Sequence, residues 1–404
     1  MASHRRSGMS DAAAAALLVV AAALLMSTAS GGVVPPRVPA VIVFGDSTMD
    51  TGNNNAIRTP LRADFPPYGR DMPGGPHPTG RFGNGRLPPD LISDALGLPP
   101  LVPAYLDPAY GMEDFARGVC FASAGTGIDN ATADVLVSAS TTIVSAYYIT
   151  TCCSIYCGRG RILPSPAFTI GDPTVIPLWK EVEYYEDYQH RLRAHLGRSR
   201  AAAIIRGALH VVSIGTNDFL ENYFLFATGR FAQFTVAEFE DFLVAGARVF
   251  LARIHGLGAR RVTFAGLAAI GCLSLERTTN ELRGRGGGCV EEYNDVAKSY
   301  NAKVKAMVRG LRDEFPKLRI AFVSVYESFL NIINDPAKYG LENVEEGCCA
   351  TGKFEMGIMC NEDAPMTCDD ADKFLFWDAF HPTEKVNRLM ANHTLQVCYQ
   401  EGVL

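Results

Sequence analysis

The chain has 404 residues, of which 48% are hydrophobic and 20% are charged, and its formal net charge at pH 7 is −6. This length and balance are typical of a globular protein that buries a sizeable core. The net charge is negative and the sequence has no basic tract or basic stripe interleaved with aromatic residues, which argues against a nucleic-acid partner.

The N-terminal segment has the pattern of a secretory signal peptide. Arg5 and Arg6 form a short basic region, an apolar run follows over 12–26, and small residues close it at 27–30. An N-terminal membrane anchor is the alternative, for which the run is somewhat short. We expect residues 1–30 to be cleaved, so that the mature protein is secreted and keeps no stable membrane span.

Strand and helix patterns alternate through most of residues 31–404, which we expect to form a single domain. The first apolar, β-branched run, 38–44, predicts a buried strand that ends at a turn. Further strands are expected at 118–125, 208–214, 261–265 and 318–326, and helices at 89–96, 179–196, 234–255, 291–315, 327–334 and 382–396. This alternation predicts an α/β fold with a parallel sheet covered by helices on both faces.

One segment, 137–174, does not fit the alternation. It is rich first in Ser and Thr, then in Cys, then in Pro, and it has no clear period. It is either a long surface insertion or translated intron sequence between two real exons. Three cysteines, Cys152, Cys153 and Cys157, lie within it.

The chain has eleven cysteines, and most of them should pair in a secreted protein. Cys272 and Cys289 flank a Gly/Arg-rich loop and are the best candidates for one bridge. The cluster 348–368 predicts local bridges of unassigned connectivity. Free buried thiols are one alternative, and zinc is another that no paired Cys-x-x-Cys or nearby His cluster supports. The sequons at Asn130 and Asn392 are glycosylation sites if they are exposed in a secretory compartment.

Ser47 is the candidate nucleophile. It follows the first expected strand in the turn Gly45-Asp46-Ser47, where glycine permits a close backbone path. A serine hydroxyl attacks only when a base removes its proton, so a base must lie nearby. The alternative is an ordinary turn in which Asp46 or Ser47 caps a helix.

Asp378 and His381 are the candidate base and its orienting carboxylate. They are close enough in sequence to supply both groups that a serine hydrolase needs. A structural histidine with satisfied hydrogen bonds is the alternative for His381. Asp187 and His190 have the same spacing, but they lie in a charged helical stretch that favours a solvated surface pair.

Two further turns offer donors for an oxyanion hole, which must stabilise the negative oxygen formed by attack on an ester carbonyl. Gly125 can offer its backbone N–H and Asn217 its side-chain amide, and the backbone N–H of Ser47 is a third donor. Taken separately, Gly125 and Asn217 are also common turn residues. Each of these turns follows an expected strand, and ligands of open parallel sheets bind at that edge.

The order of these motifs resembles the plant GDSL esterase/lipase family within the SGNH hydrolases. The likeness covers about residues 40–398 except the irregular segment. It is carried by Gly-Asp-Ser-x-x-Asp-x-Gly-Asn-Asn-Asn at 45–55, Phe-Ala-Ser-Ala-Gly ending at Gly125, Ile-Gly-Thr-Asn-Asp ending at Asp218, and Trp-Asp-Ala-Phe-His-Pro at 377–382. Pro-Pro-Tyr-Gly-Arg-Asp at 66–71, Thr-Gly-Arg-Phe at 79–82 and Gly-Cys-Cys at 347–349 add to it.

The resemblance implies a flavodoxin-like three-layer α/β/α sandwich with a mostly parallel sheet, and neither a metal nor an organic cofactor. It assigns Ser47 as nucleophile, His381 as general base and Asp378 as the residue that orients it, with Gly125 and Asn217 in the oxyanion hole. The sequence departs from the family at Cys120, which stands where Asn is usual and could alter the turn that presents Gly125. Ala268, Ala269 and Ser274 replace prolines often seen near the Gly-Cys loop.

Together these observations predict a secreted serine hydrolase that cleaves small-molecule or polymer-linked carboxylic esters through an acyl-enzyme on Ser47. Acyl transfer to a sugar, phenolic or hydroxy-acid acceptor would use the same intermediate and remains an alternative. A non-catalytic binding protein on a retained hydrolase scaffold is the third, because a fold does not guarantee its usual activity. No pattern in the sequence assigns an oligomeric state.

Overall fold

The computed structural model describes residues 38–134, 175–224, 230–364 and 366–404. The signal peptide expected at 1–30 and the irregular segment 137–174 lie outside these residues and stay predictions. Val38–Leu404 group into one compact unit. Among the described residues, no helix combines the length and the hydropathy needed to cross a membrane.

A five-stranded parallel sheet with the order β2-β1-β3-β4-β5 forms the centre of the fold. Its strands are β1 (Val41–Gly45), β2 (Gly118–Cys120), β3 (Leu209–Ser213), β4 (Arg261–Ala265) and β5 (Arg319–Val323). The strand order is that of a flavodoxin-like sheet, whose switch point lies between β1 and β3. The predicted parallel sheet is therefore confirmed.

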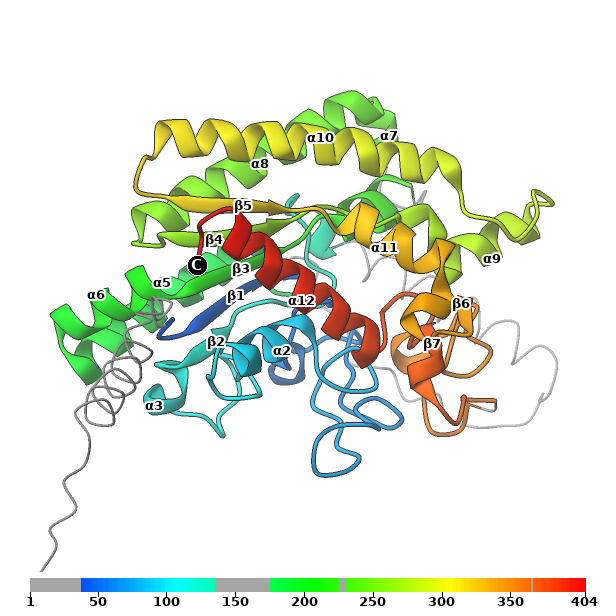
Figure 1. Ribbon diagram of the computed structural model, residues 1–404, viewed down its shortest axis with the longest axis horizontal. Helices are drawn as coiled ribbons and strands as arrows, with labels where there is room; N and C mark the ends of the chain where they lie inside the picture. Colours follow the sequence, from blue (N-terminus) through cyan, green and yellow to red (C-terminus); the bar gives the residue numbers. More distant parts are fainter. Residues whose placement is uncertain (1–37, 135–174, 225–229, 365) are drawn as a thin grey trace, which may run out of the picture. The chain divides into compact units, whose positions relative to one another are not determined.

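Helices flank this sheet (Figure 1). The longer ones are α2 (Pro88–Ala95), α5 (Leu178–Leu196), α6 (Arg198–Gly207), α8 (Val236–Gly256), α9 (Ser274–Leu282), α10 (Glu291–Glu314), α11 (Val325–Asn334) and α12 (Glu384–Gln400). Two short α-helices, α3 (Met112–Phe115) and α7 (Arg230–Gln233), and a π-helix at Asp218–Tyr223 complete the set together with several 3-10 turns.

The alternation of side chains along β1 builds two separate cores. Ile42 and Phe44 face a core formed with α5, α8 and α10, whereas Val41 and Val43 face one formed with α2 and α12. Figure 1 shows α2 and α12 on one side of the sheet and α8 and α10 on the other. Strands that are buried on both faces have continuous apolar sequences, and this is why they could be predicted from the sequence. The three-layer α/β/α sandwich is confirmed.

Several elements differ from the sequence expectations. The strand expected at 118–125 ends at Cys120, where the chain turns into a loop. α6 was not expected. Gly197, with φ of 80°, ends α5, and α6 begins at the next residue. Because α6 buries only Ala201 and Ile205, its sequence has little apolar periodicity. A small parallel sheet of β6 (Asn343–Gly347) and β7 (Phe374–Phe376) was also not expected, because its strands are short and β6 is polar.

Three disulfides lie among the described residues. Cys272–Cys289 confirms the predicted bridge. The cluster 348–368 contains Cys348–Cys368 and Cys349–Cys360, which confirms local bridging and supplies its connectivity. Of the other described cysteines, Cys120 and Cys398 carry free buried thiols.

His210 on β3 is a buried histidine that should make stability depend on pH. Its Nδ1 lies 3.2 Å from the Arg261 carbonyl oxygen and its Nε2 lies 3.0 Å from the Tyr185 hydroxyl, so the neutral ring donates to one and accepts from the other. Burial lowers the pKa of His210 to about 4. In the unfolded chain the pKa is ~6.5, so the unfolded state binds more protons between these values and stability is lost as the pH falls through them.

Between pH 7 and pH 5 this histidine should cost the protein about 2 kcal/mol of unfolding free energy. The measurement is urea unfolding of the wild type and His210→Asn at both pH values, because the comparison cancels other titrating groups. The advantage of the wild type over the variant should shrink by that amount at pH 5. An advantage that is equal at both pH values would contradict the prediction.

Candidate active site

Ser47 lies one residue beyond the turn made by Gly45 and Asp46 at the carboxyl end of β1, and its exposed fraction is 6%. Gly45 has φ of 144°, and a Cβ added there would lie 2.1 Å from the Ser213 carbonyl oxygen, so only glycine fits. The same carbonyl accepts a hydrogen bond from the Asp46 N–H at 3.2 Å. The close approach of β1 and β3 therefore presents Ser47 at the sheet edge.

The turn beyond Ser47 is held by its neighbours. Asp46 Oδ1 accepts hydrogen bonds from the Thr48 backbone N–H at 3.0 Å and from the Thr48 hydroxyl at 2.7 Å. On the opposite side the Gly45 N–H donates to Glu181 Oε2 at 3.0 Å. These contacts fix the backbone on both sides of the candidate nucleophile.

His381 lies beside Ser47, although the two residues are 334 positions apart in the chain. Its Nε2 lies 2.8 Å from Ser47 Oγ, and its Nδ1 lies 2.9 and 2.8 Å from the two carboxylate oxygens of Asp378. A carboxylate only accepts hydrogen bonds, so Nδ1 carries the hydrogen and Nε2 is left to accept from the serine hydroxyl. This is the geometry of a nucleophile, a base and an orienting group.

The turn that carries Asp378 and His381 follows β7. Asp378 Oδ1 accepts the backbone N–H groups of Phe380 at 2.9 Å and His381 at 2.7 Å, which folds the turn around its own carboxylate. The Trp377 N–H donates to the His381 carbonyl oxygen at 2.7 Å and closes the turn. The short strand that the sequence did not predict is therefore the support of this part of the site.

The second Asp–His pair lies elsewhere. Asp187 and His190 are both exposed on α5, and Asp187 accepts a hydrogen bond from the Tyr105 hydroxyl. Their placement fits the surface pair that the charged helical pattern favours.

The two candidate oxyanion-hole residues lie on loops that contact each other. Gly125 follows β2 with φ of 86°, a conformation that favours glycine. Asn217 follows β3, and its side-chain amide donates to the Thr126 carbonyl oxygen at 2.9 Å. The Ser123 N–H donates to the Gly45 carbonyl oxygen at 3.0 Å, which ties the first of these loops to the nucleophile turn.

Two buried aspartates that the sequence analysis did not single out hold these loops. Asp50 accepts the backbone N–H of Ala124, the residue before Gly125, at 3.1 Å. Asp218 accepts the backbone N–H groups of Ile128 at 2.8 Å and Asp129 at 2.9 Å. The available signal was their position, because each lies a few residues beyond a strand end inside one of the quoted motifs.

Cys120 packs within β2 rather than in the turn that presents Gly125. Its thiol donates to the Met49 carbonyl oxygen at 3.2 Å, and its carbonyl oxygen accepts from the Asn53 side-chain amide at 2.9 Å. Burial raises the pKa of Cys120 to about 12, so the sulfur stays a neutral thiol at neutral pH. The departure from the family pattern is accommodated by the strand and its neighbours.

Buried carboxyl groups lie around the nucleophile turn. Burial raises the pKa of Asp46 and raises that of Glu181 well above its ordinary value. Burial, with the nearby charges of Asp46 and Asp218, raises the pKa of Glu221 to about 8. Most of Glu221 is therefore neutral at neutral pH, which limits the negative charge around the nucleophile turn.

No group of three or more His, Cys, Asp or Glu side chains in the described ranges is arranged to hold a metal ion.

The family model and the curated relatives that match this chain all belong to one family. The family model described as GDSL-like Lipase/Acylhydrolase matches residues 41–394. In Arabidopsis thaliana, GDSL esterase/lipase At2g04570 is 48% identical over 88% of this chain and 90% of its own length, and GDSL esterase/lipase At2g42990 is 49% identical over the same shares. GDSL esterase/lipase At4g26790 from the same organism is 47% identical over 89% of this chain and 91% of its own length.

Proposed function

This chain belongs to the GDSL-like lipase/acylhydrolase family and is a carboxylic-ester hydrolase, and we propose that it cleaves its substrates through an acyl-enzyme on Ser47. The observation that carries the proposal is the continuous contact from Ser47 Oγ to His381 Nε2, and from His381 Nδ1 to the Asp378 carboxylate.

In the first half-reaction His381 acts as a base and then as an acid. Nε2 takes the hydroxyl proton of Ser47 while Oγ attacks the ester carbonyl carbon. The imidazolium that forms is stabilised by Asp378, which keeps Nδ1 protonated. Nε2 then gives its proton to the departing alkoxy oxygen, so that an alcohol leaves and the acyl group stays on Oγ.

In the second half-reaction water replaces the alcohol. Nε2 takes one proton from the water as its oxygen attacks the acyl carbon, and the bond to Oγ then breaks. The same proton returns to Oγ, the carboxylic acid leaves, and Ser47 is restored. No group beyond the triad and water is needed for the balance of atoms.

The negative oxygen of both tetrahedral intermediates would be held by Gly125, Asn217 and Ser47. The backbone N–H groups of Gly125 and Ser47 provide two donors. An amide nitrogen carries two hydrogens, and Thr126 accepts one from Asn217, which leaves the other for the oxyanion. Fixed donors of this kind need no reorganisation when the charge develops.

We also propose that the enzyme works outside the cytosol after cleavage of residues 1–30. Three disulfides among the described residues support an oxidising compartment. Both sequon asparagines, Asn130 and Asn392, are exposed and are proposed glycosylation sites. The substrate would be a small-molecule or polymer-linked ester, and the chain would act as a single catalytic domain.

Product analysis tests hydrolysis against transfer and binding. Purified protein incubated with p-nitrophenyl butyrate should release p-nitrophenol and butyric acid in equal amounts. Addition of glycerol, glucose or a phenol as acceptor should leave the acid as the main acyl product. A butyrate ester of the acceptor as the main product would favour a transferase. A folded protein that releases neither product from a panel of acyl chain lengths would favour a binding protein.

A further inference from the structure

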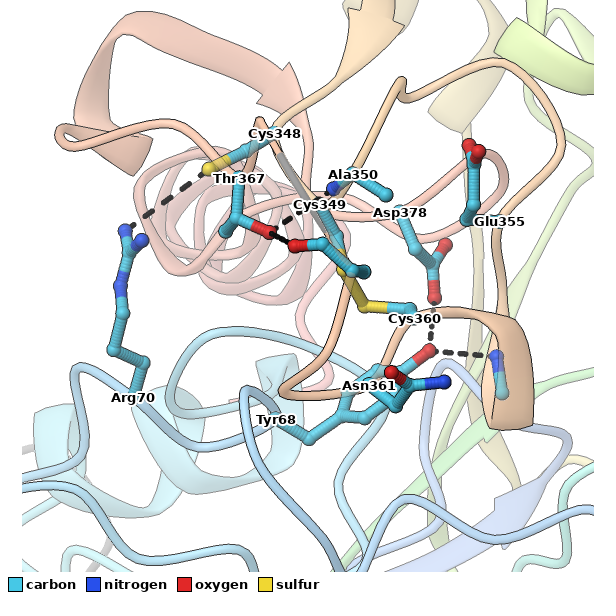
Figure 2. Close-up of a disulfide and its surroundings, with 12 residues drawn as sticks. Tyr68, Arg70, Cys348, Cys349, Ala350, Glu355, Cys360, Asn361, Thr367 and Asp378 are labelled. Carbon is cyan, nitrogen blue, oxygen red and sulfur yellow. Dashed lines mark hydrogen bonds between the residues drawn. A yellow bond between two sulfur atoms is a disulfide. The ribbon is translucent and has the colours of Figure 1, made fainter.

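Tyr68 contacts the proposed catalytic carboxylate from the long loop that precedes α2. Its hydroxyl oxygen lies 2.8 Å from Asp378 Oδ2, across 310 positions of the chain, and its exposed fraction is 1%. The backbone N–H of Gly357 donates to the same hydroxyl oxygen at 2.8 Å. Figure 2 shows the Tyr68 hydroxyl beside Asp378, with dashed lines for both of these hydrogen bonds.

These two partners fix the direction of the phenolic hydrogen. Gly357 occupies the oxygen as a donor, so the hydrogen of Tyr68 points to Asp378, which can only accept. Burial, followed by the charge of Asp378, raises the pKa of Tyr68 well above its ordinary value. The phenol is therefore a neutral hydrogen-bond donor at neutral pH.

The contact supplies something that the local turn does not. The turn's own N–H groups, from Phe380 and His381, both bind Oδ1 of Asp378. Within the described part of the chain, Oδ2 of Asp378 has two hydrogen-bond donors, the Tyr68 hydroxyl and the Nδ1–H group of His381. With one oxygen held by the turn and the other by Tyr68, the carboxylate plane cannot rotate away from Nδ1.

Tyr68 itself is held on two sides. Its ring packs against Phe82 and Trp377, with centroid distances of 5.7 and 6.4 Å, and the Phe82 ring lies 5.0 Å from that of His381.

The loop that carries Gly357 is closed by a disulfide between Cys349 and Cys360 (Figure 2). The N–H of Cys349 also donates to the carbonyl oxygen of Trp377, the residue before Asp378, at 2.7 Å. The Cys349–Cys360 bridge therefore ties the loop of Gly357, which donates to the Tyr68 hydroxyl, to the turn that carries the orienting carboxylate of Asp378.

We propose that Tyr68 is a positioning residue for catalysis, which fixes the Asp378 carboxylate against His381 through a hydrogen bond oriented by Gly357 in the loop closed by Cys349–Cys360. The inference rests on the proposed function, because it assigns Tyr68 a role through the Ser47–His381–Asp378 triad. Its effect should fall on the chemical step and not on substrate binding.

The test replaces Tyr68 with phenylalanine and uses Tyr188→Phe as the matched control. Tyr188 is also buried, and its hydroxyl donates to the Phe115 carbonyl oxygen at 3.0 Å, a partner outside the proposed triad. Tyr68→Phe should lower kcat for p-nitrophenyl butyrate by about 10- to 100-fold, since it removes a hydrogen bond to a charged group, with KM changed by less than about threefold. Tyr188→Phe should keep kcat within about twofold of the wild type.

The rate of labelling by a fluorophosphonate probe gives a second readout, because it depends on the activated serine and not on the choice of ester. It should fall in parallel with kcat in Tyr68→Phe. In an Asp378→Asn background, Tyr68→Phe should cause less than about a twofold further loss, since the two residues act as one unit. A folded Tyr68→Phe with wild-type kcat and labelling rate, or losses that multiply in the double variant, would overturn the proposal.

Should Tyr68→Phe fail to fold, 3-fluorotyrosine placed at position 68 keeps the ring and the hydroxyl. The fluorinated phenol is a stronger hydrogen-bond donor to Asp378 than tyrosine is. Asp378 then stabilises the protonated imidazole of His381 less. The acidic limb of the kcat–pH profile should therefore move to lower pH, while 3-fluorotyrosine at position 188 should leave it in place. If 3-fluorotyrosine at position 68 leaves the acidic limb in place, the positioning role of Tyr68 is wrong and the proposed triad is unaffected. Wild-type labelling and turnover in Ser47→Ala would instead refute the triad on which the inference depends.

Discussion

Ser47→Ala should lower kcat for p-nitrophenyl butyrate by about 10⁵- to 10⁶-fold, the scale of loss found when a serine hydrolase loses its nucleophile. The variant keeps Gly45, Asp46 and the whole turn but has no oxygen to receive the acyl group. The remaining turnover would come from binding and the oxyanion donors acting on water. Stopped-flow or long-time-course absorbance of p-nitrophenol measures the loss.

The loss must come from the chemistry and not from unfolding. The Ser47 hydroxyl contacts His381 Nε2, and its removal leaves the backbone contacts of the turn in place. The thermal unfolding midpoint should therefore stay within a few degrees of the wild type. Ser213→Ala is the matched control, because that hydroxyl lies at the neighbouring strand end, 3.4 Å from the Thr48 hydroxyl. It should keep kcat within a few-fold, and a Ser47→Ala enzyme as active as this control would refute the assignment.

Asp378→Asn should lower kcat by about 10⁴-fold while leaving the size of the side chain unchanged. The asparagine oxygen can still accept the turn's N–H groups, as Oδ1 of Asp378 does. The amide nitrogen then stands where Oδ2 stood and donates to His381 Nδ1. The imidazole proton moves to Nε2, which can no longer accept the proton of Ser47.

The matched control for this change is Asp187→Asn, at the aspartate of the exposed Asp–His pair on α5. It makes the same chemical substitution without touching the triad, and kcat should stay within about twofold of the wild type. Equal losses in the two variants, or full activity in Asp378→Asn, would show that Asp378 does not orient the base.

The central strands and the meeting of the site residues could be predicted because they follow from local pattern and one topological rule. β1, β3, β4 and β5 are apolar runs buried in a two-sided sheet, so continuous hydrophobicity marks them. The carboxyl ends of parallel strands share an edge, and that rule brings the loops after β1, β2 and β3 together. That rule places Ser47, Gly125 and Asn217 at one edge of the sheet as candidates, and the resemblance to the GDSL family assigned their roles.

Other features had no local signal that indicated their contacts. Tyr68 lies in the Pro-Pro-Tyr-Gly-Arg-Asp motif at 66–71, which adds to the family resemblance, but the motif does not indicate a partner 310 residues away. β7 has three residues, yet it places the turn of Asp378 and His381. Such short, irregular elements are stabilised by long-range contacts, which a single sequence does not display.

The cysteines show the same division. Cys272 and Cys289 are 17 residues apart, on either side of α9 and the Gly/Arg-rich loop that follows it, so their pairing could be predicted from proximity in the chain. The four cysteines at 348–368 allow three pairings, and sequence distance does not choose among them. The fold of the loop determines the pairing. It brings Cys368 to Cys348, and it brings Cys360 to Cys349, whose N–H donates to the Trp377 carbonyl oxygen.

The most direct test of the nucleophile is covalent labelling of the folded protein with a fluorophosphonate, which phosphonylates an activated serine oxygen and releases fluoride. Intact-mass and peptide analysis should find one phosphonyl group per chain, carried by Ser47, and the Ser47→Ala variant should take up none. A label on another residue, or equal labelling of wild type and Ser47→Ala, would contradict the account.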